Sequence, residues 1–144
     1  MDAENTHLLA AELRPVLTRL MRKLRKLSPA NTTLSQTERS VLVLLEHQQL
    51  LSAELAVLEK ITPQSMGQIL NHLSDLNLIG KNPSPTDKRK IYISLSPEGR
   101  EMIQQVRSER EEWLFKAITE VCTDKEQQIL KAAIGPLTKL VDYK

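Results

Sequence analysis

The chain has 144 residues, of which 3% are aromatic and 26% are charged, and its formal net charge is +2. This length suits one domain with a hydrophobic core, and a core of aliphatic side chains with few aromatics is typical of helical proteins. A net charge so close to zero does not indicate a polyanionic partner by itself, so any electrostatic argument depends on where the charges lie.

Several kinds of site and compartment are disfavoured by the sequence. Cys122 is the only cysteine, so we expect no internal disulfide, and we interpret it as an inert, partly buried thiol, with a redox sensor as the alternative. His7, His47 and His72 are too scattered to indicate a metal site, with convergence of distant residues on a metal as the alternative, and no cofactor motif is visible. No segment approaches the roughly 20 apolar residues of a membrane span, and no export signal is present. We therefore expect a cytoplasmic protein without a metal, cofactor or membrane contact.

One amphipathic helix is predicted over residues 8–27. Pro15 either kinks this helix or marks its start, and Pro29 ends it by pushing Ser28 out of the helical region. The apolar positions recur at helical spacing: Leu13, Val16, Leu17, Leu20, Met21, Leu24 and Leu27. The basic run is interpreted as a solvated face, with phosphate contact as the alternative: Arg14, Arg19, Arg22, Lys23, Arg25 and Lys26.

Capping signals predict three further helices. Ser35 and Glu38 have the spacing of a capping box, which opens a helix to about His47. Ser52 is predicted to cap a short helix that ends near Glu59. Thr62 is predicted to cap the next helix. Pro63 then occupies the first helical position, where a missing N–H costs nothing.

Beyond Leu78 the hydrophobic pattern changes from helical to alternating. Residues 90–95 alternate apolar with polar side chains and predict a half-buried strand, with 79–82 as its partner across a Pro-rich loop. Ser96 and Pro97 then repeat the cap-plus-proline signal for a long helix to about Val121. A second capping box at Thr123 opens the last helix, which we expect to be kinked or divided at 135–136.

The layout of helix, tight turn, helix and basic hairpin over residues 52–95 is that of a winged helix-turn-helix. The helix over 62–76 has an apolar side of Met66, Ile69, Leu70, Leu73 and Leu76 and a polar side of Gln64, Ser65, Gly67, Gln68, Asn71, His72 and Asp75. Amides suit the reading of adenine in the major groove, and Gly67 permits close approach of the backbone. The alternative is an ordinary solvated helix face.

The hairpin loop places three cations, Lys88, Arg89 and Lys90, directly after Asp87. Such a tip can contact phosphates or enter a narrow minor groove. Because Asp87 would repel DNA, we expect it to pair with a nearby cation and hold the loop in shape. The alternative is an exposed charged turn that keeps an edge hairpin soluble.

In these features the sequence resembles the MarR family of bacterial transcriptional regulators. The resemblance spans nearly the whole chain and lies in the segments 34–39, 55–56, 61–66, 73–79 and 94–99 and in Asp87-x-Arg89. It implies a homodimer in which the first helix interlocks with the two C-terminal helices, two winged helices bind successive major grooves, and a small phenolic or other anionic effector binds between the dimer helices and the DNA-binding lobes. Trp113 and Phe115 of the long helix are interpreted as residues that pack in the dimer interface, with an aromatic ligand-binding pocket as the alternative.

Carried over by position, the resemblance assigns Arg89 to the minor groove, Asp87 to wing stabilisation, and to the major groove Gln64, Ser65, Gln68, Asn71 and His72. From the charge of the loop itself, we expect phosphate contacts from Lys88, Arg89 and Lys90. Many relatives carry a basic residue within the recognition helix, whereas no Lys or Arg occurs here between Ile61 and Gly80. The amide-rich helix therefore predicts an operator rich in A·T steps.

The expected fold is mainly α with a small β-hairpin wing. We expect an N-terminal dimerisation helix (1–33), a winged helix-turn-helix lobe that binds double-stranded DNA (34–96) and C-terminal dimerisation helices (97–144) within one compact chain. The predicted function is that of a ligand-responsive homodimeric repressor, and the alternative is a winged-helix module that binds protein. An enzyme is not expected, because no nucleophile, base and orienting group are recognisable and the chain has only four glycines, none in a phosphate-binding loop.

Overall fold

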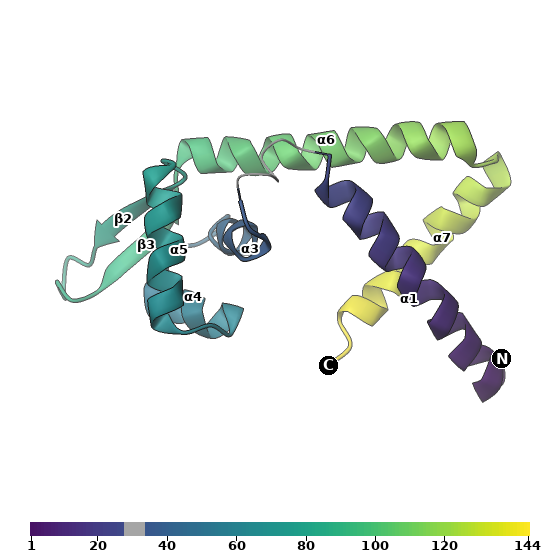
Figure 1. Cartoon of the computed structure of the whole chain (residues 1–144), viewed down its shortest axis with the longest axis horizontal. Coiled ribbons are helices and arrows are strands. Elements are labelled where there is room, and N and C mark those ends of the chain that lie inside the picture. The colour runs from purple at the N-terminus through teal and green to yellow at the C-terminus, as the bar shows by residue number, and fades with distance from the viewer. Residues whose placement is uncertain (28–33) are drawn as a thin grey trace. The chain divides into compact units, whose positions relative to one another are not determined.

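A computed structural model describes residues 1–27 and 34–144. The elements in chain order are α1 (Ala3–Arg25), α3 (Gln36–Leu44), β1 (Leu50–Leu51), α4 (Ser52–Glu59), α5 (Pro63–Asp75), β2 (Ile79–Pro83), β3 (Ile91–Leu95), α6 (Pro97–Val121) and α7 (Asp124–Val141), as labelled in Figure 1. The expected fold, mainly α with a small β-hairpin, is confirmed. Contacts divide the chain into two compact units, Met1–Arg107 and Ser108–Lys144.

Helix α1 begins earlier than its hydrophobic pattern predicts. Asp2 is its N-cap, and the Asp2 carboxylate accepts a hydrogen bond from the backbone N–H of Asn5 at 2.8 Å. Pro15 lies inside the helix, so the suggestion that the regular helix starts there is wrong. The missing N–H of one proline removes a single hydrogen bond from a helix of 23 residues. The predicted terminator around Pro29 lies outside the described residues.

The helices of the helix-turn-helix begin at local caps. The Ser35–Glu38 capping box is confirmed, with both of its hydrogen bonds present at 2.9 and 3.1 Å. Helix α3 ends at Leu44, before the expected His47. The predicted Ser52 cap is wrong: Leu51 is the N-cap of α4, and its backbone N–H donates to Glu54 at 2.9 Å.

The turn between α4 and α5 passes through a left-handed residue. Lys60 closes α4 with φ 57° and ψ 41°, and the next backbone N–H, that of Ile61, donates to the carbonyl of Ala56 at 3.1 Å. The predicted Thr62 cap of α5 is confirmed, since its hydroxyl accepts from the N–H of Ser65 at 3.1 Å. Helix α5 therefore has a fixed starting point.

The sheet has three antiparallel strands in the order β1-β3-β2. The predicted hairpin of β2 and β3 is confirmed, with Ile79 opposite Leu95 and Pro83 opposite Ile91. Strand β1 was not predicted, because two residues are too short to show an alternating pattern. It places Leu50 opposite Ile93, and both side chains are buried.

Ser96 joins the base of the hairpin to α6. Its hydroxyl accepts from the N–H of Gly99 at 2.9 Å, which confirms the predicted cap, and donates to the carbonyl of Asn77 at 2.7 Å. A Cβ on Gly99 would lie 2.2 Å from the carbonyl oxygen of Leu78, so only glycine fits this contact. Further along α6, the two terminal nitrogens of the Arg107 guanidinium, Nη1 and Nη2, donate to the carboxylate of Glu46, in the loop after α3.

One hydrophobic cluster holds α3, α4, α5 and the sheet together. Its fully buried side chains include Leu42, Leu45, Leu55, Met66 and Leu73, and Ile103 of α6 also belongs to it. Leu76 does not belong to it. That side chain is 40% exposed, so the predicted apolar side of α5 is not buried as far as Leu76. Burial of the remaining apolar side leaves the polar side of α5 facing outward.

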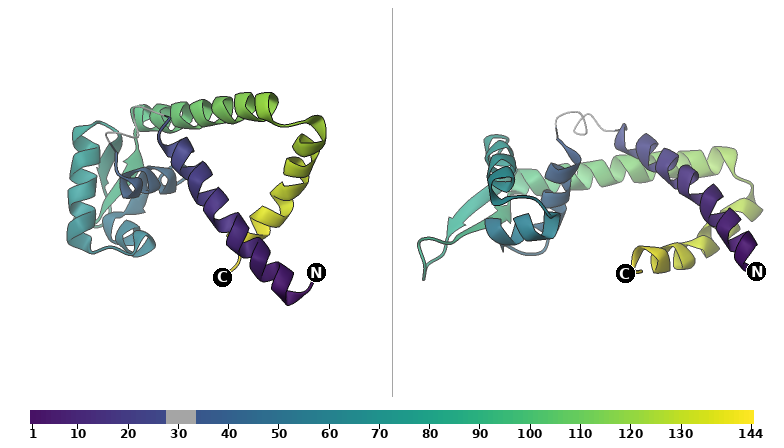
Figure 2. Two further views of the ribbon diagram at one scale, coloured as in Figure 1. Left: turned by 45° about the vertical axis from the view of Figure 1, so that its right-hand side comes forward. Right: turned by 60° about the horizontal axis from the view of Figure 1, so that its bottom comes forward.

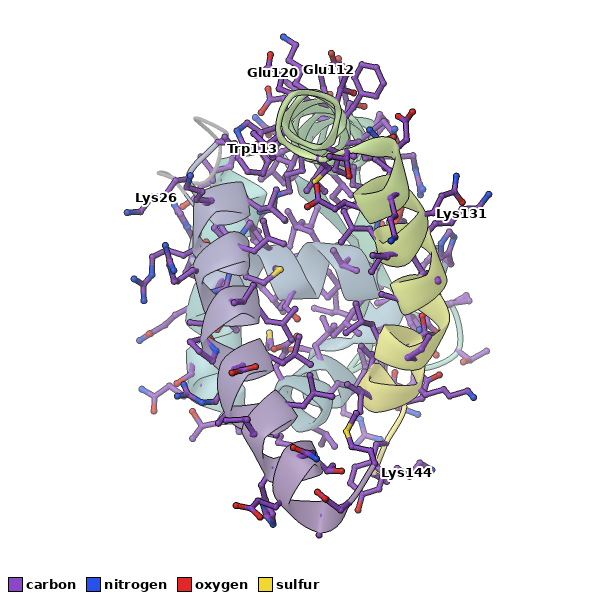
Figure 3. The ribbon with its side chains drawn as sticks, turned by 90° about the vertical axis from the view of Figure 1, so that its right-hand side faces the viewer. Lys26, Glu112, Trp113, Glu120, Lys131 and Lys144 are labelled. Atoms are coloured by element: carbon purple, nitrogen blue, oxygen red, sulfur yellow. The ribbon has the colours of Figure 1, made fainter. Side chains whose placement is uncertain are left out.

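In the second unit, the predicted capping box at Thr123 is confirmed, with hydrogen bonds to and from Glu126 at 2.8 and 3.2 Å. Helix α7 runs through Pro136 without a break, so the expected division there is wrong. Figure 3 shows Glu112 and Glu120 projecting from one side of α6 and Trp113 lying on another. Cys122 is a free, half-buried cysteine, as expected. No helix in the described ranges is long and apolar enough to cross a membrane.

Candidate nucleic-acid interface

The predicted major-groove residues all lie on the exposed side of α5. Gln64, Ser65, Gln68, Asn71 and His72 are exposed, while the residues on the opposite side pack into the core. The Thr62 hydroxyl donates to Ser65 Oγ at 2.9 Å, which leaves the Ser65 O–H proton to donate outward. A Cβ built on Gly67 meets no atom within 4 Å, so the surface beside it is open. The N-terminal half of α5 therefore offers polar groups and an uncovered backbone.

Lys81 is a candidate site residue that the sequence did not indicate. Its ammonium donates to Asn71 Oδ1 at 3.1 Å, so a cation from β2 reaches the polar face of α5. The register explains this contact. Lys81 lies opposite Ile93, and directly opposed residues in an antiparallel pair project from the same face of the sheet. Although α5 contains no Lys or Arg, its exposed face has a neighbouring positive charge.

His72 contacts a residue of α3. Its Nδ1 is paired with Oε2 of Glu38, whose other carboxylate oxygen caps α3 at Ser35. Burial raises the pKa of Glu38, but the hydrogen bonds from Ser35 and His72 outweigh burial and hold that pKa below its ordinary value. Glu38 is therefore ionised at neutral pH. The signal for this pair is absent from local sequence, because the partners lie 34 positions apart.

The wing loop is built by its own hydrogen bonds. The buried Ser84 hydroxyl accepts from the N–H groups of Thr86 and Asp87, both at 3.3 Å, and the Ser84 N–H donates to the carbonyl of Lys90 at 2.8 Å. Asp87 Oδ1 accepts from the backbone N–H of Arg89 at 3.0 Å and from its Nε–H at 3.3 Å. These are contacts of the kind expected for a wing stabiliser. The role of Ser84 was not predicted.

The cations of the wing face solvent. Lys88, Arg89 and Lys90 are exposed, and the Arg89 side chain is 92% exposed. Figure 2 shows the β2–β3 hairpin extending away from α4 and α5, so that its tip lies clear of the helices. The first unit thus presents a polar helix face and a separate cationic tip.

Other kinds of site find less support. Among the described residues, no group of three His, Cys, Asp or Glu side chains could hold a metal ion. A hollow on α4 is lined by Ala53, Glu54, Val57 and Leu58. This lining contains no cation, so it does not match the expected anionic effector.

Comparison with known proteins identifies relatives among transcriptional regulators. No protein-family model matches the sequence. The chain is 30% identical over 135 residues to an uncharacterised HTH-type transcriptional regulator of Mycobacterium leprae, which covers 93% of each chain. It is also 30% identical to the HTH-type transcriptional regulator FarR of Neisseria gonorrhoeae, over 81% of this chain and 78% of that one.

Solved structures show the same fold. A transcriptional regulator from Pseudomonas aeruginosa superposes with a TM-score of 0.85 at 28% identity, covering all of both chains. A MarR family protein from Bacillus stearothermophilus gives 0.76 at 18% identity, over 99% of each chain. A mutant of MepR from S. aureus, solved bound to an oligodeoxyribonucleotide, gives 0.72 at 16% identity over 92% of this chain and 96% of that one. The chain belongs to the MarR family of winged helix-turn-helix transcriptional regulators.

Proposed function

We propose that this chain is a homodimeric repressor that occupies a pseudo-palindromic DNA site and is released by a small effector. The observation that carries the proposal is the pairing of two surfaces in one lobe. The exposed polar face of α5 and the cationic tip of the β2–β3 wing extend from the same hydrophobic core. Helix and wing are the two parts with which a winged helix contacts a duplex.

Each surface has a distinct task. Lys88 and Lys90 contact phosphates and supply salt-dependent affinity, while Arg89 enters the minor groove. Gln64, Ser65, Gln68, Asn71 and His72 face base edges in the major groove. Lys81 adds a positive charge beside Asn71. Because phosphate contacts position a protein and base contacts specify the sequence, the wing controls affinity more than α5 does.

Exposed apolar side chains on α1 and α7 support a homodimer. Leu17, Leu20 and Met21 of α1 are exposed, as are Ile129, Leu130 and Ile134 of α7. Such residues at helical spacing on long helices are typical of surfaces that a partner covers. A second copy of the chain, with the same helices, would bury them and carry two winged lobes on one assembly.

We also propose that a phenolic or other anionic effector binds the dimer, because the resemblance to the MarR family implies one. It would act by binding the two conformations of the dimer with different affinities, since a ligand with equal affinity for both shifts nothing. Regulation of this kind requires no catalytic step. Thermal shift against phenolic acids, followed by a DNA-release assay, tests for it: a compound that stabilises the protein and releases DNA supports the effector, and stabilisation without release contradicts it.

Selection from a pool of random duplexes tests the proposal. We expect enrichment of an inverted repeat with half-sites about one helical turn apart. The amides of α5 predict that these half-sites are rich in A·T steps. The rival function, a winged-helix module that binds protein, predicts no enrichment. Half-sites rich in G·C would contradict base reading by the amides while leaving DNA binding intact.

A further inference from the structure

The carboxylate of Glu38 lies between the first turn of α3 and the imidazole of His72. One oxygen accepts from the N–H of Ser35 at 2.9 Å, and the other is paired with Nδ1 of His72. The Glu38 side chain is 9% exposed, whereas the His72 side chain is 48% exposed. One ring nitrogen of His72 is therefore held by a buried group, while the rest of the ring reaches the surface of α5.

The chemistry of this pair determines which ring nitrogen carries the proton. An ionised carboxylate can only accept hydrogen bonds, so Nδ1 of His72 must be the donor. A neutral imidazole has one N–H group, and the nitrogen opposite an engaged donor is left as an acceptor. With its proton on Nδ1, His72 has only the lone pair of Nε2 to offer outward.

We infer that Glu38 is a positioning residue that makes the neutral imidazole of His72 an acceptor when α5 reads DNA. In the major groove, cytosine and adenine present amino donors at N4 and N6, whereas the polar groups of guanine and thymine are acceptors. His72 should therefore favour cytosine or adenine at the position it contacts. This inference rests on the proposed function, because it requires α5 to lie in the major groove.

Glu38→Gln is a shape-matched test. The glutamine oxygen can accept from the Ser35 N–H as the carboxylate does, which turns the amide NH₂ toward His72. An amide donor forces Nδ1 to accept, so the proton of a neutral ring moves to Nε2. The substitution should thus reverse the hydrogen-bonding character of the exposed nitrogen while keeping the cap of α3.

The first readout needs no DNA. Long-range ¹H–¹⁵N NMR at alkaline pH, where imidazoles are neutral, shows which ring nitrogen is protonated. We expect Nδ1–H for His72 in the wild type and Nε2–H in Glu38→Gln. The chain has three histidines, so His7 and His47 serve as internal controls and should not change. The same tautomer in both proteins, or a wild-type ring protonated on both nitrogens or on Nε2 alone, overturns the inference. The wild-type spectrum alone shows whether Nδ1 of His72 carries the proton, so the inference can be overturned even if the variant does not fold.

The second readout is base preference. At the same alkaline pH, duplexes carrying each base pair in turn at every half-site position are bound to wild type, Glu38→Gln, His72→Ala and the double variant. We expect Glu38→Gln to change the preference at one position by on the order of tenfold, away from cytosine or adenine, and to have no such effect in the His72→Ala background. Unchanged preference overturns the DNA-reading part of the inference. A reversed tautomer in a protein that binds no DNA would support the control of His72 by Glu38 and refute the proposed function.

Discussion

Asp87 holds Arg89 twice, because one carboxylate oxygen accepts both the backbone N–H at 3.0 Å and the side-chain Nε–H at 3.3 Å. The two residues lie at the tip of the wing, where the Arg89 side chain is almost fully exposed. The contact restricts a long, flexible side chain before any partner arrives. Ordering such a side chain in advance lowers the entropy cost of binding.

Two substitutions at Asp87 distinguish the effect of its hydrogen bonds on DNA affinity from the effect of its negative charge. Asp87→Asn keeps an oxygen that can accept from the Arg89 backbone, whereas Asp87→Ala removes the acceptor. Because Asp87 also repels phosphate, removing its charge alone should not weaken binding. We expect Asp87→Ala to bind duplex DNA more weakly than Asp87→Asn, as measured by fluorescence anisotropy. Equal affinities would show that the hydrogen bonds at Asp87 do not organise the wing.

Lys81 and Asn71 should act as a coupled pair in DNA binding, since the ammonium fixes the orientation of the amide. A double-mutant cycle with Lys81→Ala and Asn71→Ala should give a coupling free energy of about 0.5 to 1.5 kcal/mol in affinity. Additive losses would mean that the two residues contact DNA independently. Lys139→Ala on α7 removes the same charge from the second unit and is the matched control.

Alanine substitutions at Gly99 and Gly67, both within helices, should change the free energy of unfolding in opposite directions. Alanine at Gly99 would press its Cβ against the Leu78 carbonyl oxygen and the Leu95 side chain, and we expect a loss on the order of 1 to 3 kcal/mol. Alanine at Gly67 meets nothing within 4 Å and should raise stability by about 0.5 to 1 kcal/mol. Urea denaturation measures both free energies of unfolding.

Gly67→Ala also tests the interface. A variant that is more stable yet binds DNA more weakly would show that the backbone at this position approaches the duplex. Unchanged DNA affinity would place Gly67 outside the contact surface. A Gly99→Ala protein as stable as the wild type would contradict the close contact between α6 and the base of the hairpin.

Ile134→Glu should disrupt the dimer, because it places a charge on an apolar side chain of α7 that is 63% exposed in the single chain. Val57→Glu on α4 is the control, since that side chain is 77% exposed and lies outside the expected dimer helices. Sedimentation velocity should show monomers for Ile134→Glu and the wild-type oligomer for Val57→Glu. A dimer that survives Ile134→Glu would exclude this face of α7 from the interface.

The predictable parts of the fold depended on contacts between near neighbours. The caps at Ser35, Thr62, Ser96 and Thr123 are hydrogen bonds between residues three positions apart, so the sequence alone locates them. Predictions of helix boundaries were wrong where one sequence signal, such as a cap, outweighed another, such as the hydrophobic pattern. The cap at Asp2 extended α1 beyond its hydrophobic pattern.

The less predictable parts of the candidate site depend on contacts between distant residues. Lys81 reaches α5 through the register of the hairpin, and Glu38 reaches His72 from another helix. Neither contact has a local signature, because tertiary packing decides which side chains meet. The exposed polar face of α5, by contrast, follows from helical periodicity and was visible in the sequence.

The most direct test of DNA binding through the wing is a salt titration of duplex affinity for the wild type and Arg89→Ala, with Lys125→Ala of α7 as the charge-matched control. The affinities of the wild type and of Lys125→Ala should fall steeply and equally as the salt concentration rises. Arg89→Ala should bind more weakly by about 1 to 3 kcal/mol, and the slope of its log affinity against log salt concentration should be shallower by about one. Identical affinity and slope for wild type and Arg89→Ala would contradict the account.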